Sequence, residues 1–168
     1  MMTEIGSQEV ETWEEDTQKD KFLTFIVENE CYGIEIKYVT EIIGIQKITE
    51  IPEMPDFIRG IINLRGKIIP VMDIRLRFKK PFQPYNDRTC IVVIDVDDLS
   101  IGLIVDSVSE VLSIPDSEIV APPEIHQKGN KYVMGVGTVG EDVKLILDCT
   151  KLLNTDEAQT LETIGKEH

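Results

Sequence analysis

The sequence predicts a mainly β protein made of two related lobes, with short helices and a helix near the C-terminal end. One observation is a series of short apolar runs separated by turn residues, a pattern typical of β-strands. The other is that the second half of the chain repeats the pattern of the first. The runs are KFLTFIV, YGIEI, GIINL, KIIPVM, TCIVVIDV, SIGLIV, YVMGVGTV and VKLIL.

Two stretches predict β-hairpins, because each places apolar residues on both sides of a short polar turn. They are residues 21–36, with the turn around ENE, and residues 88–105, with the turn at DD. Superimposing the second hairpin on the first places Gly102 on Gly33. The hairpins are therefore the beginnings of two repeats.

The match continues without a gap through VTEII (39–43) and VSEVL (108–112). The spacing of the apolar residues predicts one helical turn that lays three side chains on the core of each lobe. The residues concerned are Val39, Ile42 and Ile43 in the first repeat and Val108, Val111 and Leu112 in the second.

Further along, a shift of six residues aligns 59–78 with 134–153 and pairs Asp73 with Asp148. Each aspartate follows a strand and precedes apolar residues four apart, so both are candidate caps of short helices. The same alignment pairs Gly60 with Gly135. The repeat predicts two lobes, about 21–84 and 85–155, within one domain of residues 21–155.

Charge excludes several classes of partner. The chain has 168 residues with 17 Lys and Arg against 31 Asp and Glu, a net charge of -14 that disfavours nucleic acid and anionic lipid surfaces. Residues 1–20 are especially acidic and poor in apolar residues, apart from a few such as Trp13, and they predict a disordered tail. Residues 156–168 predict a C-terminal helix or tail.

Location and redox state follow from what the sequence lacks. The N-terminus has no basic start and apolar stretch of a signal peptide, and no apolar run approaches the roughly 20 residues that span a bilayer. We therefore expect a cytoplasmic protein. The three cysteines, Cys31, Cys90 and Cys149, lie far apart among strand residues, so we expect buried free thiols.

Motifs of catalysis and ligand binding are weak. Gly135, Gly137 and Gly140 satisfy G-x-G-x-x-G, but a strand follows where a dinucleotide site needs a helix. His126 and His168 have no partners at metal-ligand spacing, and no nucleophile has an evident base. The sequence predicts no metal, no cofactor and no enzymatic activity.

Positive charge is concentrated in residues 59–80, which hold seven Lys and Arg residues and a single acid, Asp73. One interpretation is a solvated face that balances neighbouring acids, and this applies to Arg75, Arg77, Lys79 and Lys80 in particular. Arg65 differs because it lies in a tight turn beside core strands. A guanidinium held there can make bidentate contacts with a carboxylate of the same chain or of a partner.

Three stretches together resemble the CheW family of bacterial chemotaxis coupling proteins: 32–44, 55–78 and 101–114, within a match over about residues 21–155. The resemblance implies a fold of two tandem SH3-like five-stranded β-barrels and no enzymatic activity. It implies an adaptor that joins the cytoplasmic hairpin tip of transmembrane chemoreceptors to the regulatory domain of the histidine kinase CheA, recruited to membrane receptor arrays through these partners.

The resemblance also implies roles for particular residues. Val39, Glu41, Gly60, Arg65 and Val108 match positions tied to receptor engagement or coupling. Glu124 and Ile125, in PPEI, match the kinase-contact segment of the second lobe. For Gly60 and Val108 a purely structural role is an equal alternative.

A physical hypothesis fits these roles: an apolar groove between the lobes binds an amphipathic receptor helix, while Glu41 and Arg65 set its register by charge. The alternative from another functional class is a ligand-binding regulatory β-barrel protein that uses the glycine-rich GVGTVG segment.

Overall fold

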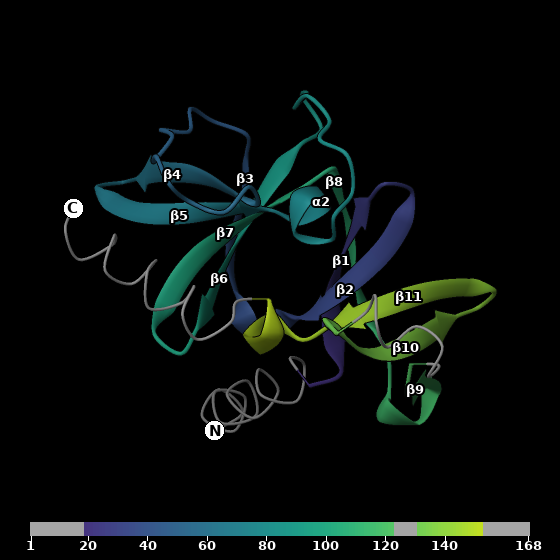
Figure 1. Ribbon diagram of the computed structural model, residues 1–168. Coiled ribbons are helices and arrows are strands. Elements are labelled where there is room, and N and C mark those ends of the chain that lie inside the picture. The colour runs from purple at the N-terminus through teal and green to yellow at the C-terminus, as the bar shows by residue number, and fades with distance from the viewer. Residues whose placement is uncertain (1–18, 123–130, 153–168) are drawn as a thin grey trace, which may run out of the picture.

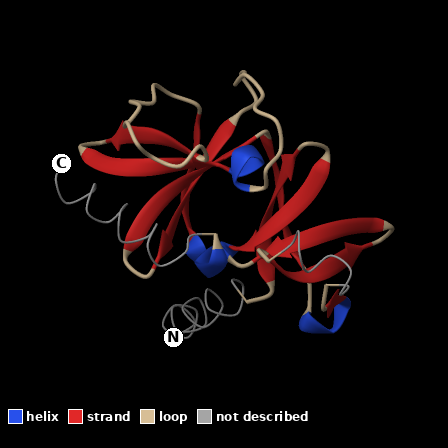
Figure 2. Cartoon of the chain, viewed as in Figure 1, coloured by secondary structure: helices blue, strands red, loops and turns tan. Residues whose placement is uncertain are grey.

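The computed structural model describes residues 19–122 and 131–152. Residues 1–18 of the predicted tail, the predicted C-terminal helix and residues Glu124 and Ile125 lie outside this part of the chain. The described residues form two β-sheets with short helical turns between strands (Figures 1 and 2). The prediction of a mainly β fold is confirmed. One sheet has six strands where five were expected, because the short β9 extends it.

The six-stranded sheet has the order β8-β1-β2-β11-β10-β9. Its strands are, in that order, β8 (Ser107–Ser113), β1 (Lys21–Val27), β2 (Glu30–Glu35), β11 (Asp142–Leu147), β10 (Val133–Val139) and β9 (Ile119–Val120). The five-stranded sheet has the order β3-β6-β7-β5-β4. Its strands are β3 (Val39–Gly44), β6 (Cys90–Val96), β7 (Leu99–Val105), β5 (Lys67–Asp73) and β4 (Ile58–Leu64).

The sheets do not follow the predicted boundary between residues 84 and 85. The hairpin β1–β2 of the first repeat lies in the sheet formed mainly by the second, and the hairpin β6–β7 of the second lies in the sheet of the first. Strand β2 pairs in parallel with β11, and β7 with β5, so each hairpin is bonded to the other repeat. Sequence repeats and sheets therefore differ, because the hairpins are exchanged.

The registers place repeat counterparts at equivalent positions of the two sheets. Gly33 lies opposite Ile146 in one sheet, and its repeat counterpart Gly102 lies opposite Val71 in the other. Both predicted hairpin turns have two residues with positive φ, Glu28 and Asn29 in the first and Asp97 and Asp98 in the second. This is the backbone of a type I′ turn, whose twist matches that of the strands it joins.

The helical turn predicted for VTEII and VSEVL is wrong. Both motifs are strands, and each lies at one end of the strand order of its sheet. A register shift in each pairing, after Val39 in β3 and beside Val108 in β8, puts an irregularity into the alternation of apolar residues. The apolar spacing was not that of one buried face, since Ile42 and Val111 are exposed on these strands.

The main core joins the two sheets. Its buried members come from both, among them Phe25 and Ile34 of the six-stranded sheet and Met72 and Leu103 of the five-stranded sheet.

The predicted caps are confirmed: the Asp73 carboxylate accepts a hydrogen bond from the Arg75 backbone N–H at 2.9 Å, and Asp148 accepts one from the Thr150 backbone N–H at 3.0 Å. Asp73 opens α2 (Ile74–Arg77), and Asp148 opens a 3-10 turn at Cys149–Lys151.

Candidate functional site

Glu41 and Arg65, two of the predicted site residues, form an ion pair across the five-stranded sheet. Glu41 lies on β3, and Arg65 lies in the turn between β4 and β5 with a φ of 53°. Since β3 and β4 stand at opposite ends of the strand order, the pair connects the two edges of this sheet. A bridge joins Ile61 of β4 to Thr49 in the segment that follows β3, so the sheet curls toward a barrel.

The Arg65 side chain remains 70% exposed and that of Glu41 30% exposed. The carboxylate partner expected for Arg65 therefore lies within the chain, but the guanidinium still faces solvent. Such an exposed pair contributes little to folding, about 0 to 1 kcal/mol. Its free N–H groups remain able to bind a carboxylate of another protein.

Gly60 has a structural reason for being glycine. Its φ is 144°, and a Cβ atom there would lie 2.1 Å from the carbonyl oxygen of Thr49. No side chain fits into this space without moving the backbone. Close packing of β4 against the segment around Thr49 requires glycine at position 60, which gives Gly60 a structural role.

Val39 and Val108 occupy equivalent places in the two repeats. Val39 lies opposite Ile94 on β6, and Val108 lies opposite Phe25 on β1. Both are half-buried and pack against the core cluster that joins the sheets. The two valines therefore belong to different sheets but rest on one shared core.

Two further apolar residues, each on the same strand as one of these valines, are exposed, although the sequence predicted them in the core. Ile42 on β3 is 44% exposed, and Val111 on β8 is 50% exposed. Superposition of the repeats pairs these two residues. The alternation of a strand, rather than a helical turn, is the signal that would have placed them on the outer face.

Most arginines of the basic segment contact other residues of the same chain. Arg77 is buried: its guanidinium lies 4.2 Å from the ring centre of Phe57 and 4.9 Å from that of Tyr132, and Nε donates to the Leu152 carbonyl at 2.7 Å. Arg59 lies 4.9 Å over the Phe82 ring. A solvated face is therefore the wrong interpretation for Arg77, which packs between aromatic rings.

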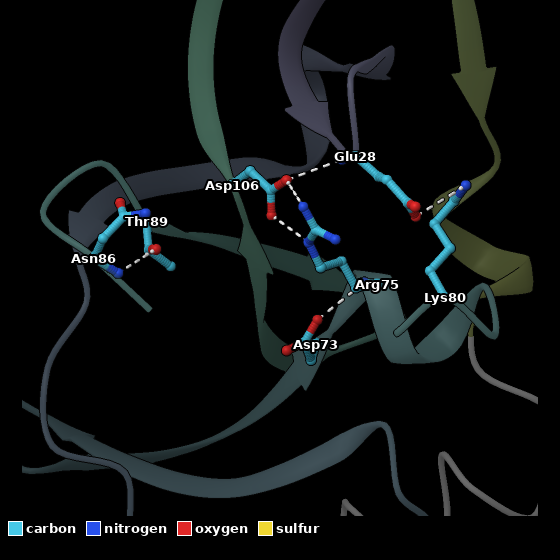
Figure 3. Close-up of polar contacts among 7 residues, drawn as sticks. All are labelled: Glu28, Asp73, Arg75, Lys80, Asn86, Thr89 and Asp106. Atoms are coloured by element: carbon cyan, nitrogen blue, oxygen red, sulfur yellow. Dashed lines mark hydrogen bonds and ion pairs between the residues drawn. The ribbon is translucent and has the colours of Figure 1, made fainter. Parts of the chain in front are cut away.

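Arg75 is also largely enclosed, at the junction of the sheets (Figure 3). Its Nε and Nη2 donate to the two carboxylate oxygens of Asp106 at 2.8 and 2.5 Å. Asp106 Oδ2 also accepts the backbone N–H of Glu28 at 2.9 Å. Burial alone would raise the pKa of Asp106, but the hydrogen bonds from Arg75 and Glu28 outweigh it and lower that pKa.

The glycine-rich segment forms the hairpin of β10 and β11, with the chain turning at Gly140 and continuing as a strand. A Cβ on Gly135 would lie 2.6 Å from Ile119, so this glycine serves close packing of β9 on β10. A hollow of about 580 Å³ lies nearby, floored by Phe22, Ile119 and Ile146. The predicted site residues that the structure describes, Val39, Glu41, Gly60, Arg65 and Val108, do not line this hollow.

Within 19–122 and 131–152, no three or more His, Cys, Asp and Glu residues gather as a metal site would require. In the same part of the chain no helix is long and apolar enough to cross a membrane. All three cysteines are free; Cys149 is buried as predicted, whereas Cys31 and Cys90 are only half-buried.

The two sheets share one core, and the candidate residues Val39, Glu41, Arg65 and Val108 lie on edge strands and in a turn, so the class is a two-sheet β protein. A model of the CheW-like domain matches residues 21–157, and the chain belongs to this family. The chain is 36% identical to the chemotaxis protein CheW of Klebsiella aerogenes, over 91% of this chain and 93% of that one. It is 33% identical to CheW of Bacillus subtilis, over 84% of this chain and 91% of that one.

A solved structure supports the same assignment. The crystal structure of the scaffolding protein TtCheW from Thermoanaerobacter tengcongensis matches with a TM-score of 0.76 and 36% identity. The match covers 82% of this chain and 96% of that chain. The exchanged arrangement of hairpins thus lies within a fold shared with a scaffold.

Proposed function

We propose that this chain is a non-enzymatic adaptor of bacterial chemotaxis, which couples transmembrane chemoreceptors to the histidine kinase CheA. Membership of the CheW family is the observation that carries the proposal. The relatives are named chemotaxis protein CheW, and the matching crystal structure is of a scaffolding protein. An adaptor needs separate surfaces for its partners.

The receptor surface in this proposal comprises Val39, Glu41, Arg65 and Val108, extended by the exposed Ile42 and Val111. Valine and isoleucine supply apolar contact area for an amphipathic helix, as in other helix-in-groove complexes. Arg65 and Glu41 set the register of that helix, because charge at the edge of an interface selects the partner and its orientation.

The kinase surface in this proposal is the segment around Glu124 and Ile125, which comes after β9 in the amino-acid sequence. The contact is with the regulatory domain of CheA. The adaptor works in the cytoplasm and reaches receptor arrays through its partners. Coupling then depends on binding both partners at once, so each individual contact needs only modest affinity.

Calorimetric titration of the full chain with the isolated regulatory domain of CheA from the same organism tests this function. We expect saturable binding that Ile125→Glu abolishes while the variant keeps its melting temperature. A matched control is Val143→Glu, a change at a residue that is 54% exposed on β11. Absence of binding at high concentration, with folded protein, would overturn the kinase-coupling role.

A further inference from the structure

The chain crosses between the two sheets at two places within residues 19–122. The first crossing, from β2 to β3, is the 3-10 turn Ile36–Tyr38. The second, from β7 to β8, passes through Asp106 alone. Each crossing leads into the strand that carries one of the valines, Val39 after the first and Val108 after the second.

The second crossing is attached to both sheets. From the five-stranded side, Arg75 at the start of α2 holds the Asp106 carboxylate with two hydrogen bonds. From the six-stranded side, the Glu28 N–H donates to the same carboxylate, and the Asp106 N–H donates to the Ile26 carbonyl at 3.0 Å. Figure 3 shows Arg75 reaching from the helix to Asp106, with Glu28 on the opposite side.

A second pair supports the same junction. Lys80, just after α2, lies 3.4 Å from the Glu28 carboxylate (Figure 3). The segment around α2 is therefore linked by two ion pairs to the crossing and to the β1–β2 turn. Arg75 is the more enclosed cation, with a side chain 14% exposed against 28% for Lys80. The two hydrogen bonds of the enclosed Arg75 therefore fix the position of Asp106 more firmly than the single, more exposed contact of Lys80 fixes that of Glu28.

The repeat shows that this attachment is specific to one crossing. Superposition of the repeats places Lys37 where Asp106 stands and Thr150 where Arg75 stands. Those two positions cannot form a guanidinium–carboxylate pair. The fold therefore builds the pair only where the chain enters β8.

We propose that the Arg75–Asp106 pair is a positioning element of the receptor surface, which holds the start of β8, and with it Val108, at a fixed place against α2. Val108 lies two residues beyond Asp106 and at the outer edge of its sheet, where only β1 pairs with the strand. Losing the pair would let the beginning of β8 shift while the common core keeps the sheets together. This inference rests on the proposed role of Val108 in receptor binding.

The test uses the full chain and two probes: a soluble fragment that carries a chemoreceptor hairpin tip, and the regulatory domain of CheA, both from the same organism. Arg75→Gln removes both the positive charge and the two-point guanidinium contact with Asp106. Arg75→Lys keeps the charge but loses the two-point contact. We expect Arg75→Gln to raise the receptor Kd about tenfold. We expect the receptor Kd of Arg75→Lys to lie between those of Arg75→Gln and the unchanged chain. The affinity of each variant for the kinase domain should stay within about twofold of the unchanged chain.

Controls separate positioning from general destabilisation. Lys80→Gln breaks only the outer pair on the same segment and should leave both affinities unchanged. Asp106→Asn should weaken receptor binding as Arg75→Gln does, and the double variant should be no weaker than either single variant, because both remove one interaction. Faster hydrogen exchange at the Glu28 amide in Arg75→Lys reports the loosened junction if the glutamine variant fails to fold.

Three results would overturn the inference. The first is unchanged receptor affinity in folded Arg75→Gln, and the second is a parallel fall of both affinities with the melting temperature. The third is normal receptor binding by Val108→Ala. If Val108→Ala loses receptor affinity but Arg75→Gln keeps it, only the positioning role fails. If Val108→Ala binds the receptor normally, the proposed receptor surface itself is wrong, and the inference falls with it.

Discussion

The missing side chain of Gly60 makes room for the carbonyl oxygen of Thr49. A Cβ at this position would approach that oxygen to 2.1 Å and the Thr49 carbonyl carbon to 2.7 Å, at a φ of 144°. Thr49 exchanges two backbone hydrogen bonds with Ile61, each 2.9 Å long, at the seam that closes the five-stranded barrel. Gly60 thus supports the seam near which Glu41 and Arg65 meet.

Gly60→Ala should lower the free energy of unfolding by about 2 to 4 kcal/mol, because the methyl group clashes with backbone and the φ is strained. Gly44→Ala is the matched control, since a Cβ there meets nothing within 4 Å, and we expect a change within about 0.5 kcal/mol. Urea denaturation measures both. Equal stability of the two variants would show that the seam can relax around an added methyl group.

The Glu41–Arg65 pair should matter more for binding than for folding. Arg65→Ala removes an exposed ion pair, so the free energy of unfolding should change by less than about 1 kcal/mol. Receptor binding should weaken by about 1 to 3 kcal/mol if the guanidinium contacts a partner carboxylate. Calorimetry with a receptor hairpin fragment measures this, with Arg88→Ala as the control at another exposed arginine. Unchanged binding would remove Arg65 from the receptor surface.

The exposed apolar residues on the two edge strands give a third prediction. Ile42→Lys and Val111→Lys should each change stability by less than about 1 kcal/mol, because both side chains already face solvent on one side. Each should weaken receptor binding about tenfold by placing a charge in an apolar contact. Val143→Lys, on β11 and 54% exposed, is the control. Full receptor affinity in both variants would confine the surface to the half-buried valines.

Sequence patterns predicted the strands, the two hairpins and the aspartate caps because each depends on residues close together in the chain. The repeat could be recognised for the same reason, through pairs such as Gly33 and Gly102. It could not reveal that the hairpins are exchanged between the repeats. Parallel pairing of β2 with β11 joins residues more than a hundred positions apart, and nothing local in the sequence selects it over pairing within a repeat.

The candidate site shows the same division. The turn at Arg65 was predictable from its neighbours, but its partner Glu41 depends on closure of the barrel. Ile42 and Val111 were misplaced because apolar residues three and four apart predicted one face of a helical turn, whereas both residues lie exposed on strands. The roles of Arg75 and Asp106 were missed because their contact joins α2 to a crossing between sheets, 31 positions away in the chain.

The thiols should differ sharply in reactivity. Burial raises the pKa of Cys149 to about 12, so this thiol is protonated and shielded at neutral pH, whereas Cys31 and Cys90 are half-buried. A thiol-specific disulfide reagent at pH 8 should label no more than two cysteines in the folded chain and all three in denaturant. Cys149→Ala should leave the native count unchanged. Rapid labelling of three thiols in the folded chain would contradict the burial of Cys149.

Acid should weaken the fold partly through Asp106. The pKa of this carboxyl is lowered in the folded chain, because hydrogen bonds from Arg75 and the Glu28 N–H outweigh the effect of burial. A lowered folded pKa means that the stabilisation is fully present above the unfolded value, about 3.9, and is lost as the pH falls through the folded value.

Asp106→Asn should therefore be less stable than the unchanged chain at pH 6, and the difference should shrink as the pH is lowered toward 3. Urea denaturation at both pH values measures this, with Asp116→Asn as the control at an exposed aspartate. Protonation of Asp106 breaks the same contact that the asparagine removes, so the two proteins converge in acid. A stability difference that stays constant from pH 6 to pH 3 would show that folding does not lower the pKa of Asp106.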